Sequence, residues 1–147
     1  MRCVRRLYPP VISNRYTDEN ENTLTSDSTQ VKDAVTSLVW QRVSVPGKKW
    51  RSDMLIAESA QLYCKRLNLG GQSWRLPTVK ELRTLLDLSR PGSIIDESSF
   101  PDGAGRFWSS TPRVGSFTTH YAWFVDTNSG TVEAYDAGLT LNARCVR

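Results

Sequence analysis

The sequence predicts an α+β domain in which two helices precede an antiparallel sheet. Apolar residues recur at helical spacing through the middle of the chain, and aromatic, strand-like segments follow Phe100. Because the helical and strand segments are segregated and do not alternate as in βαβ proteins, the α+β class is favoured. The length of 147 residues fits one domain, and Leu, Ile, Val and Phe are frequent enough to form its core.

The N-terminal third is predicted to hold little regular structure. Tyr8-Pro9-Pro10 indicates an extended connector, and the polar residues from 13 to 30 indicate a long surface loop. Leu38-Val39-Trp40 then predicts a short buried strand, which leads to a turn at Pro46-Gly47-Lys48-Lys49. We therefore expect one strand before the first helix.

Two helices are expected in the middle of the chain. Ser52 is suited to cap a first helix that runs to about Leu67, with Cys64 on its core-facing side. Thr78 and Glu81 have the spacing of a capping box, in which each side chain accepts a hydrogen bond from the backbone amide of the other residue. A second helix is predicted to start there and to end at a Pro-Gly pair after residue 90.

The last third is predicted to form the sheet. An Asn128-Ser129-Gly130 turn between two strand-like runs predicts a β-hairpin. The expected strands are Arg106-Phe107-Trp108, Ala122-Trp123-Phe124-Val125, Thr131 to Tyr135 and Leu139 to Val146.

The net charge of +4 admits an anionic partner without requiring one. Arginine supplies most of the 19 basic residues, and guanidinium groups are well matched to sulfate, phosphate and carboxylate. The charge is too mild to indicate nucleic-acid binding, so we expect no nucleic-acid partner. The longest apolar run, Tyr121 to Val125, is far shorter than the roughly 20 residues of a membrane-spanning helix. No membrane span is expected.

The three cysteines, Cys3, Cys64 and Cys145, show none of the short spacings of zinc or redox sites. We expect no metal and no cofactor. An odd count favours one disulfide and one remaining thiol, which indicates an oxidising compartment. The expected location is extracellular, at the cell surface or periplasmic.

The segment Arg2-Cys3-Val4-Arg5 is repeated letter for letter as Arg144-Cys145-Val146-Arg147. This repeat predicts a tandem array of similar domains. Residues 1–6 are then the remnant of a preceding repeat or an introduced start, and residues 7–147 form the domain. A neighbouring repeat of the same protein is accordingly an expected partner.

Several motifs occur in an order found in one known family. The most specific are Trp74-Arg75-Leu76-Pro77-Thr78 and Trp108-Ser109-Ser110-Thr111. The others are Val31-Lys32-Asp33, Thr36 to Arg42, Tyr63-Cys64, Glu81-Leu82, Phe100-Pro101 and Arg144 to Arg147. Over residues 15–147 the chain resembles the Lcl C-terminal domain family, although Ser37 stands where the family usually has Gly and the loop before Val31 is expanded.

The resemblance implies a C-type lectin-like fold, which the formylglycine-generating, sulfatase-modifying enzymes share. It implies an exported bacterial protein and a disulfide between Cys64 and Cys145. It also implies that the motif residues are structural. These are Trp40, Trp74, Arg75, Pro77, Thr78, Glu81, Trp108, Ser109, Ser110 and Trp123.

No catalytic residues are expected. An enzyme related to the formylglycine-generating oxidases would need two reactive cysteines near the C-terminal end, where only Cys145 occurs. His120 is a lone histidine, and no spacing marks Asp96 and Asp102 as an acid/base pair. The Glu-Pro-Asn, Gln-Pro-Asp and Trp-Asn-Asp sequences of calcium-dependent lectins are absent.

The best candidate binding surface is basic. The turn before the first helix and the polar face of that helix carry a group of cations that could form one surface. These are Arg42, Lys48, Lys49, Arg51, Lys65 and Arg66, and the predicted ligand-binding set also includes Arg106, Arg113 and Tyr121. Trp108 and Trp123 are expected in the core, with an exposed stacking platform as the alternative. Arg75 and Arg144 are expected to bond carbonyls or carboxylates.

We therefore expect a noncatalytic, extracellular recognition or adhesion module. Its ligand would be a polysaccharide, possibly sulfated or acidic, or a cell-surface protein. The alternatives are an enzyme related to sulfatase-modifying oxidases and a structural spacer repeat of a surface protein.

Overall fold

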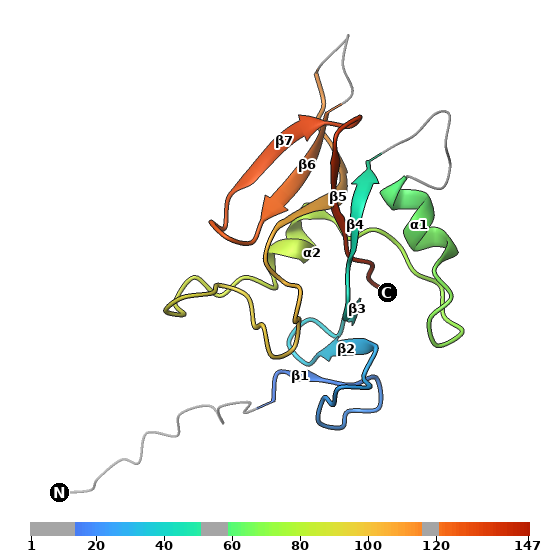
Figure 1. Cartoon of the computed structure of the whole chain (residues 1–147), viewed down its shortest axis with the longest axis vertical. Coiled ribbons are helices and arrows are strands. Elements are labelled where there is room, and N and C mark those ends of the chain that lie inside the picture. The colour runs from blue at the N-terminus through green and yellow to red at the C-terminus, as the bar shows by residue number, and fades with distance from the viewer. Residues whose placement is uncertain (1–13, 51–58, 116–120) are drawn as a thin grey trace, which may run out of the picture.

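The computed structural model describes residues 14–50, 59–115 and 121–147, which are coloured in Figure 1. In chain order its elements are β1 (Tyr16–Thr17), β2 (Gln30–Asp33), β3 (Val39–Gln41), β4 (Val45–Lys49), α1 (Ala60–Arg66), α2 (Val79–Arg83), β5 (Arg106–Pro112), β6 (Tyr121–Asp126), β7 (Val132–Asp136) and β8 (Thr140–Ala143). Two short helices followed by most of a sheet confirm the predicted α+β class.

The strands form two sheets of unequal size. β1, β2 and β3 pair in that order as a small antiparallel sheet, whereas the larger sheet has the order β4-β8-β5-β6-β7. Neighbours in the larger sheet are antiparallel, except β5 and β8, which are parallel. In Figure 1 the small sheet lies below the larger one, and the chain runs upward from β3 into β4.

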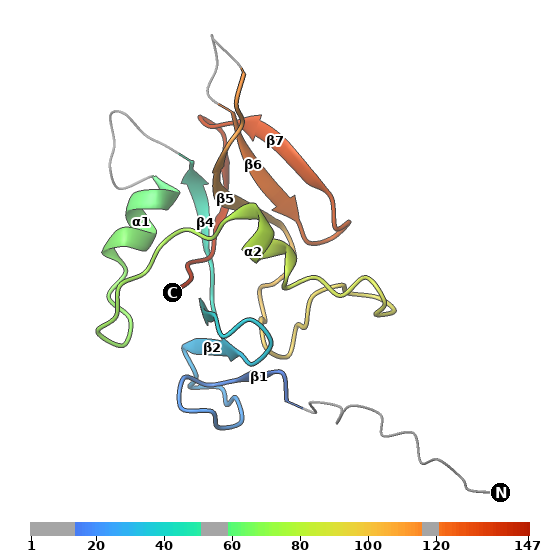
Figure 2. The ribbon, with the colours of Figure 1, turned by 180° about the vertical axis from the view of Figure 1, so that it is seen from behind.

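The two helices cover opposite faces of the larger sheet. Successive side chains of a strand point to opposite faces, so Trp108 and Phe107 of β5 enter different parts of the core. Trp108 packs in the cluster that contains Cys64 of α1, whereas Phe107 packs in the cluster that contains Leu82 of α2. Figure 2 shows α2 in front of β5 and β6, the reverse of its position in Figure 1.

Helix α1 begins later than the sequence predicts. Its N-cap is Ser59, which is extended (φ −75°, ψ 128°) and whose hydroxyl accepts a hydrogen bond from the Leu62 amide. A serine is available at either position, so local preference does not distinguish them. The predicted cap, Ser52, lies outside the described residues. Cys64 is fully buried, as expected for the core-facing side of the helix.

Helix α2 has the predicted start and an earlier end. The Glu81 amide donates to the Thr78 hydroxyl at 3.2 Å, and the Thr78 amide donates to the Glu81 carboxylate at 2.8 Å. These contacts confirm the capping box. The prediction of an end near residue 90 is wrong: Thr84 is the C-cap, and its hydroxyl donates to the Glu81 carbonyl at 2.6 Å. This bond takes a carbonyl that a longer helix would use.

The expectation of one strand before the first helix is wrong: β1, β2 and β4 precede α1 in addition to β3, and β1 and β4 occupy segments that were predicted to be loop or turn. In the polar segment, Tyr16 of β1 pairs with Asp33 of β2. Strand β4 includes the predicted turn residues, and its pairing with β8 shifts register between Val45 and Lys48. Gly47 has φ 67°, in the left-handed region that glycine adopts readily. Because an edge strand tolerates proline and glycine at a bulge, turn-like residues are compatible with a strand here.

The C-terminal segment is bonded to two separate parts of the chain. Val39 of β3 and Arg147 exchange two backbone hydrogen bonds of 2.9 Å. On the other side, the Arg75 amide donates to the Val146 carbonyl at 3.0 Å, and the Val146 amide donates back at 2.8 Å. The end of the chain thus joins the small sheet to the segment that precedes α2.

The disulfide between Cys64 and Cys145 is present, as the family resemblance implied. Both cysteines are completely buried. The bond attaches α1 to the C-terminal segment across a sequence separation of 81 residues. Cys3, the expected remaining thiol, lies outside the described residues.

Replacing Cys64 and Cys145 by Ala is expected to destabilise the domain by about 4 kcal/mol, because the unfolded chain loses a long-range crosslink. Urea unfolding of the variant and of the oxidised wild type measures this difference. The Cys3→Ala variant is the control and should unfold like the wild type. Equal unfolding midpoints for the double variant and the wild type would contradict the assignment.

Candidate functional site

The predicted basic turn and the first helix lie side by side. Lys48 Nζ is 5.4 Å from the centre of the Tyr63 ring, so β4 and α1 are in contact through these side chains. The backbone of Lys49 forms an isolated bridge with Ser59, immediately before α1 begins. The structure therefore brings the cations of β4 to the helix.

The last turn of α1 adds two further cations, Lys65 and Arg66, and both are exposed. We call the resulting set the basic β4–α1 surface; it consists of Lys48, Lys49, Lys65 and Arg66. Arg51, which was predicted to belong to it, lies outside the described residues. Neither β4 nor α1 contains an acidic residue.

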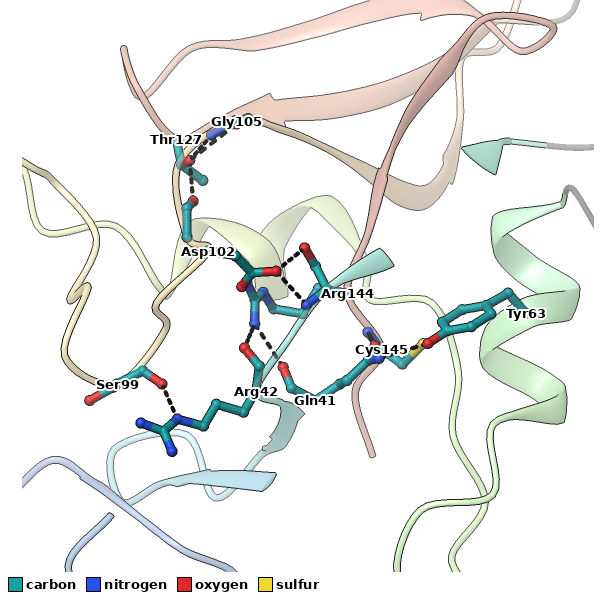
Figure 3. Close-up of polar contacts among 11 residues, drawn as sticks. Gln41, Arg42, Tyr63, Ser99, Asp102, Gly105, Thr127, Arg144 and Cys145 are labelled. Atoms are coloured by element: carbon teal, nitrogen blue, oxygen red, sulfur yellow. Dashed lines mark hydrogen bonds and ion pairs between the residues drawn. The ribbon is translucent and has the colours of Figure 1, made fainter. Parts of the chain in front are cut away.

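Arg42 does not belong to this surface. It is 9% exposed, and its guanidinium donates to backbone carbonyls of two loops. The acceptors are Ser28 and Ser99 at 3.2 Å each, Ser98 at 3.4 Å, and Thr25. Figure 3 shows Arg42 directed at the Ser99 carbonyl. Its role is to tie these loops together, which leaves the guanidinium no free face for a ligand.

Arg106 and Arg113 lie near opposite ends of β5. Arg106 is opposite Asp126 in the strand register and forms an ion pair with it at 3.3 Å. Beyond the other end of the strand, the guanidinium of Arg113 is 5.8 Å from the centre of the Tyr121 ring. The structure thus joins Arg113 to Tyr121 but does not bring Arg106 to the same place.

The two sheet tryptophans have different environments. Trp108 is fully buried, and its indole nitrogen donates to the Lys48 carbonyl at 2.8 Å. Trp123 is only half-buried and is absent from both core clusters, so its prediction as a core residue is wrong. Trp123 lies between Ala122 and Phe124, which pack into the core on the opposite face of β6.

The two most specific sequence motifs contact each other. The Ser110 amide donates to the Pro77 carbonyl at 2.7 Å, and the Val79 amide donates to the Thr111 hydroxyl at 3.2 Å. These bonds attach the start of α2 to β5. Several other motif residues are buried, namely Trp40, Trp74, Pro77, Trp108 and Ser109.

Arg75 and Glu81 form an ion pair beside this contact. Two hydrogen bonds of 2.7 Å connect the guanidinium to the carboxylate. A hydrogen bond from Arg75 is the main reason that the pKa of Glu81 is lowered, and the Thr78 amide adds to it. Arg75 therefore fixes the carboxylate that caps α2, which agrees with its predicted structural role.

Asp102 forms an ion pair with a buried arginine. Arg144, which is 1% exposed, donates to the Asp102 carboxylate at 2.6 Å. Burial alone would raise the pKa of Asp102, but Arg144 and Ser44 outweigh it and hold that pKa below its usual value. Arg144 also donates to the Gln41 carbonyl at 2.8 Å, and Figure 3 shows these groups converging on it.

The structure also contains a pocket of about 530 Å³ that the sequence did not predict. It lies between β1, the polar loop after β1 and the segment that follows α2. Its lining includes Arg15, Tyr16, Leu24, Asp87, Arg90 and Asp96. We call it the β1 pocket. The available sequence signal was the pair of Asp-x-Ser sequences at 87–89 and 96–98, which indicate ordered turns.

Arg15 connects one side of the β1 pocket to the fold. Its guanidinium forms hydrogen bonds of 2.9 and 2.8 Å with the fully buried carboxylate of Asp33, and it donates to the Thr84 carbonyl at 2.8 Å. Across the pocket, Arg90 is 3.8 Å from the Asp96 carboxylate. The pocket therefore contains both guanidinium and carboxylate groups.

Within the three described ranges, no three His, Cys, Asp or Glu side chains are placed together as a metal site would require. The single histidine, His120, falls in the undescribed residues 116–120. None of the helices described is both long and apolar enough to span a bilayer.

These features define a disulfide-closed α+β domain with a basic surface and a polar pocket. The chain belongs to the Lcl C-terminal domain family, whose sequence profile matches residues 29–147. The match begins just before β2, so β1 and the first part of the polar loop precede the matched residues. No curated protein matches the chain.

Replacing Asp102 by Asn is expected to destabilise the domain by about 2 kcal/mol at pH 6. Breaking a buried ion pair typically costs about 3 to 5 kcal/mol, and the partial exposure of Asp102 reduces that figure. Because the folded-state pKa of Asp102 is lowered, its contribution is complete above the unfolded pKa of about 4 and is lost as the pH falls through the folded value. Urea unfolding at several pH values measures both effects.

The difference in the free energy of unfolding between wild type and Asp102→Asn should therefore become smaller as the pH is lowered. Asp27→Asn, at an exposed position, is the matched control and should have the same free energy of unfolding as the wild type at every pH. A wild-type stability for Asp102→Asn at pH 6 would contradict the role of this ion pair.

Proposed function

We propose that this domain is a noncatalytic, extracellular recognition module that binds acidic polysaccharide through the basic β4–α1 surface. The observation that carries the proposal is the contact between Lys48 and Tyr63, since it places the cations of β4 beside those of α1. The potentials of neighbouring charges add, so the exposed Lys65 and Arg66 act together on an approaching anion.

The form of this surface is suited to a polymer with repeated charge. Lys65 and Arg66 project from an exposed helix face and not from an enclosed cavity. Contacts between exposed charges are individually weak and are screened by salt, so useful affinity requires several of them at once. A sulfated or carboxylated polysaccharide supplies such repeated contacts. Its binding is therefore expected to weaken steeply as salt is added.

Two observations support a role in binding over a role in catalysis. Cys145, the cysteine nearest the C-terminal end of the fold, is bonded to Cys64, and a disulfide sulfur is no thiolate nucleophile. Asp96 and Asp102, the carboxylates considered for acid/base work, both have lowered pKa values. A general acid would need a raised pKa to hold its proton at neutral pH.

The fold and location included in the proposal are a C-type lectin-like architecture and an exported protein. A bond from the first helix to the end of the last strand region supports the former, since the family resemblance implied that pairing. A buried disulfide supports the latter, because disulfides persist mainly in oxidising compartments.

Reversing two charges on α1 should weaken binding to heparin. The Lys65→Glu/Arg66→Glu variant replaces two attractive contacts by repulsive ones, and we expect the dissociation constant to rise about tenfold, which is about 1.4 kcal/mol. Isothermal titration and the salt concentration of elution from immobilised heparin measure the change.

The matched control is Lys80→Glu/Arg83→Glu, which makes the same charge change on exposed positions of α2. This control should lose much less affinity. Equal losses in the two variants would show that heparin responds only to net charge, and the proposed surface would be rejected.

A further inference from the structure

The β1 pocket is built from segments that are distant in sequence. Tyr16 comes from β1 and Arg15 directly precedes it, Leu24 comes from the polar loop, and Asp87 and Asp96 come from the chain after α2. Its volume of about 530 Å³ lies within the usual range of about 300 to 1,000 Å³ for small-molecule sites. The lining includes no residue of the basic β4–α1 surface, and Figures 1 and 2 show β1 at the opposite end of the molecule from the top of β4.

Tyr16 lines this pocket and carries a fixed aromatic ring and a hydroxyl. Its ring packs edge-on against Phe100 with 5.2 Å between ring centres, and the Arg15 guanidinium lies 4.9 Å from the Tyr16 ring centre. In the described part of the chain, the Tyr16 hydroxyl has no hydrogen-bond partner. Burial raises the pKa of Tyr16 to about 12, so the hydroxyl keeps its proton and can both donate and accept.

The two pocket carboxylates are oriented by serines. Asp87 Oδ1 accepts hydrogen bonds from the Ser89 amide and hydroxyl at 3.0 and 2.6 Å. Asp96 accepts from the Ser98 hydroxyl at 2.6 Å, from the Ser98 amide at 3.1 Å and from the Ser99 hydroxyl at 3.0 Å. A carboxylate has about four acceptor positions. Asp87, which accepts two of these bonds, therefore retains more capacity for a ligand than Asp96, which accepts three. Ser89 lowers the pKa of Asp87, and for Asp96 the serine hydrogen bonds outweigh the opposing effect of burial.

The charges of the pocket are nearly balanced. Asp33 neutralises Arg15 through two hydrogen bonds, and Arg90 faces Asp96 at 3.8 Å. Asp87 adds one further negative charge. A sulfated or phosphorylated ligand would meet carboxylates here, and an isolated cation would meet guanidinium groups. A neutral ligand with many hydroxyl groups avoids repulsion from either kind of charge, because a hydroxyl donates to a carboxylate and accepts from a guanidinium.

We propose that the β1 pocket binds one unit of a neutral, hydroxyl-rich saccharide. Its hydroxyls donate to Asp87 and Asp96 and accept from Arg90, and the Tyr16 hydroxyl bonds a further oxygen of the ring. The apolar C–H groups of the sugar pack against Leu24 and Leu85, which also line the pocket. This site goes beyond the proposed function, since it uses none of the residues of the basic β4–α1 surface.

The test is an NMR titration of the full 147-residue chain with maltotriose, cellotriose, mannotriose and chitotriose, each to about 20 mM. We expect at least one of them to shift the amide signals of Tyr16, Ser98 and Ser99 in a saturable way. The amides of Lys65 and Arg66 should stay unchanged. Absence of saturable shifts at the pocket with all four trisaccharides overturns the proposal, as do pocket shifts produced only by a heparin oligosaccharide.

Two variants with matched controls separate specific binding from nonspecific effects. Tyr16→Phe removes the hydroxyl and keeps the ring, and Asp87→Asn removes one charge; each should raise the trisaccharide dissociation constant about three- to tenfold. The controls are Tyr135→Phe and Asp27→Asn, which make the same changes at exposed positions, and they should bind like the wild type. Wild-type affinity in both pocket variants overturns the proposal.

Discussion

The buried guanidinium of Arg144 is the constraint around which the rest of the domain is arranged. A buried charge without partners would cost several kcal/mol, so the chain must supply acceptors on every side of it. It does so with the Asp102 carboxylate and with the carbonyls of Gln41 and Arg42. The rings of Phe100 and Phe107 lie within 5.3 Å of the guanidinium carbon. Satisfying this one group fixes the end of β3, the loop before β5 and the C-terminal segment relative to one another.

The residues next to Arg144 in the structure, Cys145 and Arg42, connect this buried centre to the two surfaces proposed to bind ligands. Cys145 holds α1 through the disulfide, and α1 carries the exposed cations of the basic β4–α1 surface. Arg42 binds the carbonyls of Ser98 and Ser99, two residues that line the β1 pocket. The bonded interior around Arg144 and Cys145 thus supports both the basic β4–α1 surface and the β1 pocket.

Sequence reasoning succeeded where the determining interaction is local. The capping box involves Thr78 and Glu81, only three residues apart, and its hydrogen bonds follow from that spacing. The disulfide between Cys64 and Cys145 was implied only by family resemblance, because three cysteines alone allow several pairings. The burial of Arg42 and its hydrogen bonds to loop carbonyls were not predictable, since its acceptors are up to 57 residues away in the sequence. The β1 pocket was missed for the same reason: Arg15 is held by Thr84 at a separation of 69 residues.

We propose that this domain recognises saccharides without catalysing a reaction and without a metal. A glycan array that includes acidic polysaccharides and neutral oligosaccharides, probed with the whole chain in calcium and again in EDTA, tests it most directly. We expect retention on acidic glycans that decreases with salt, retention on a subset of neutral glycans, and the same pattern in both buffers. Failure to bind any glycan, or loss of all binding in EDTA, would contradict it.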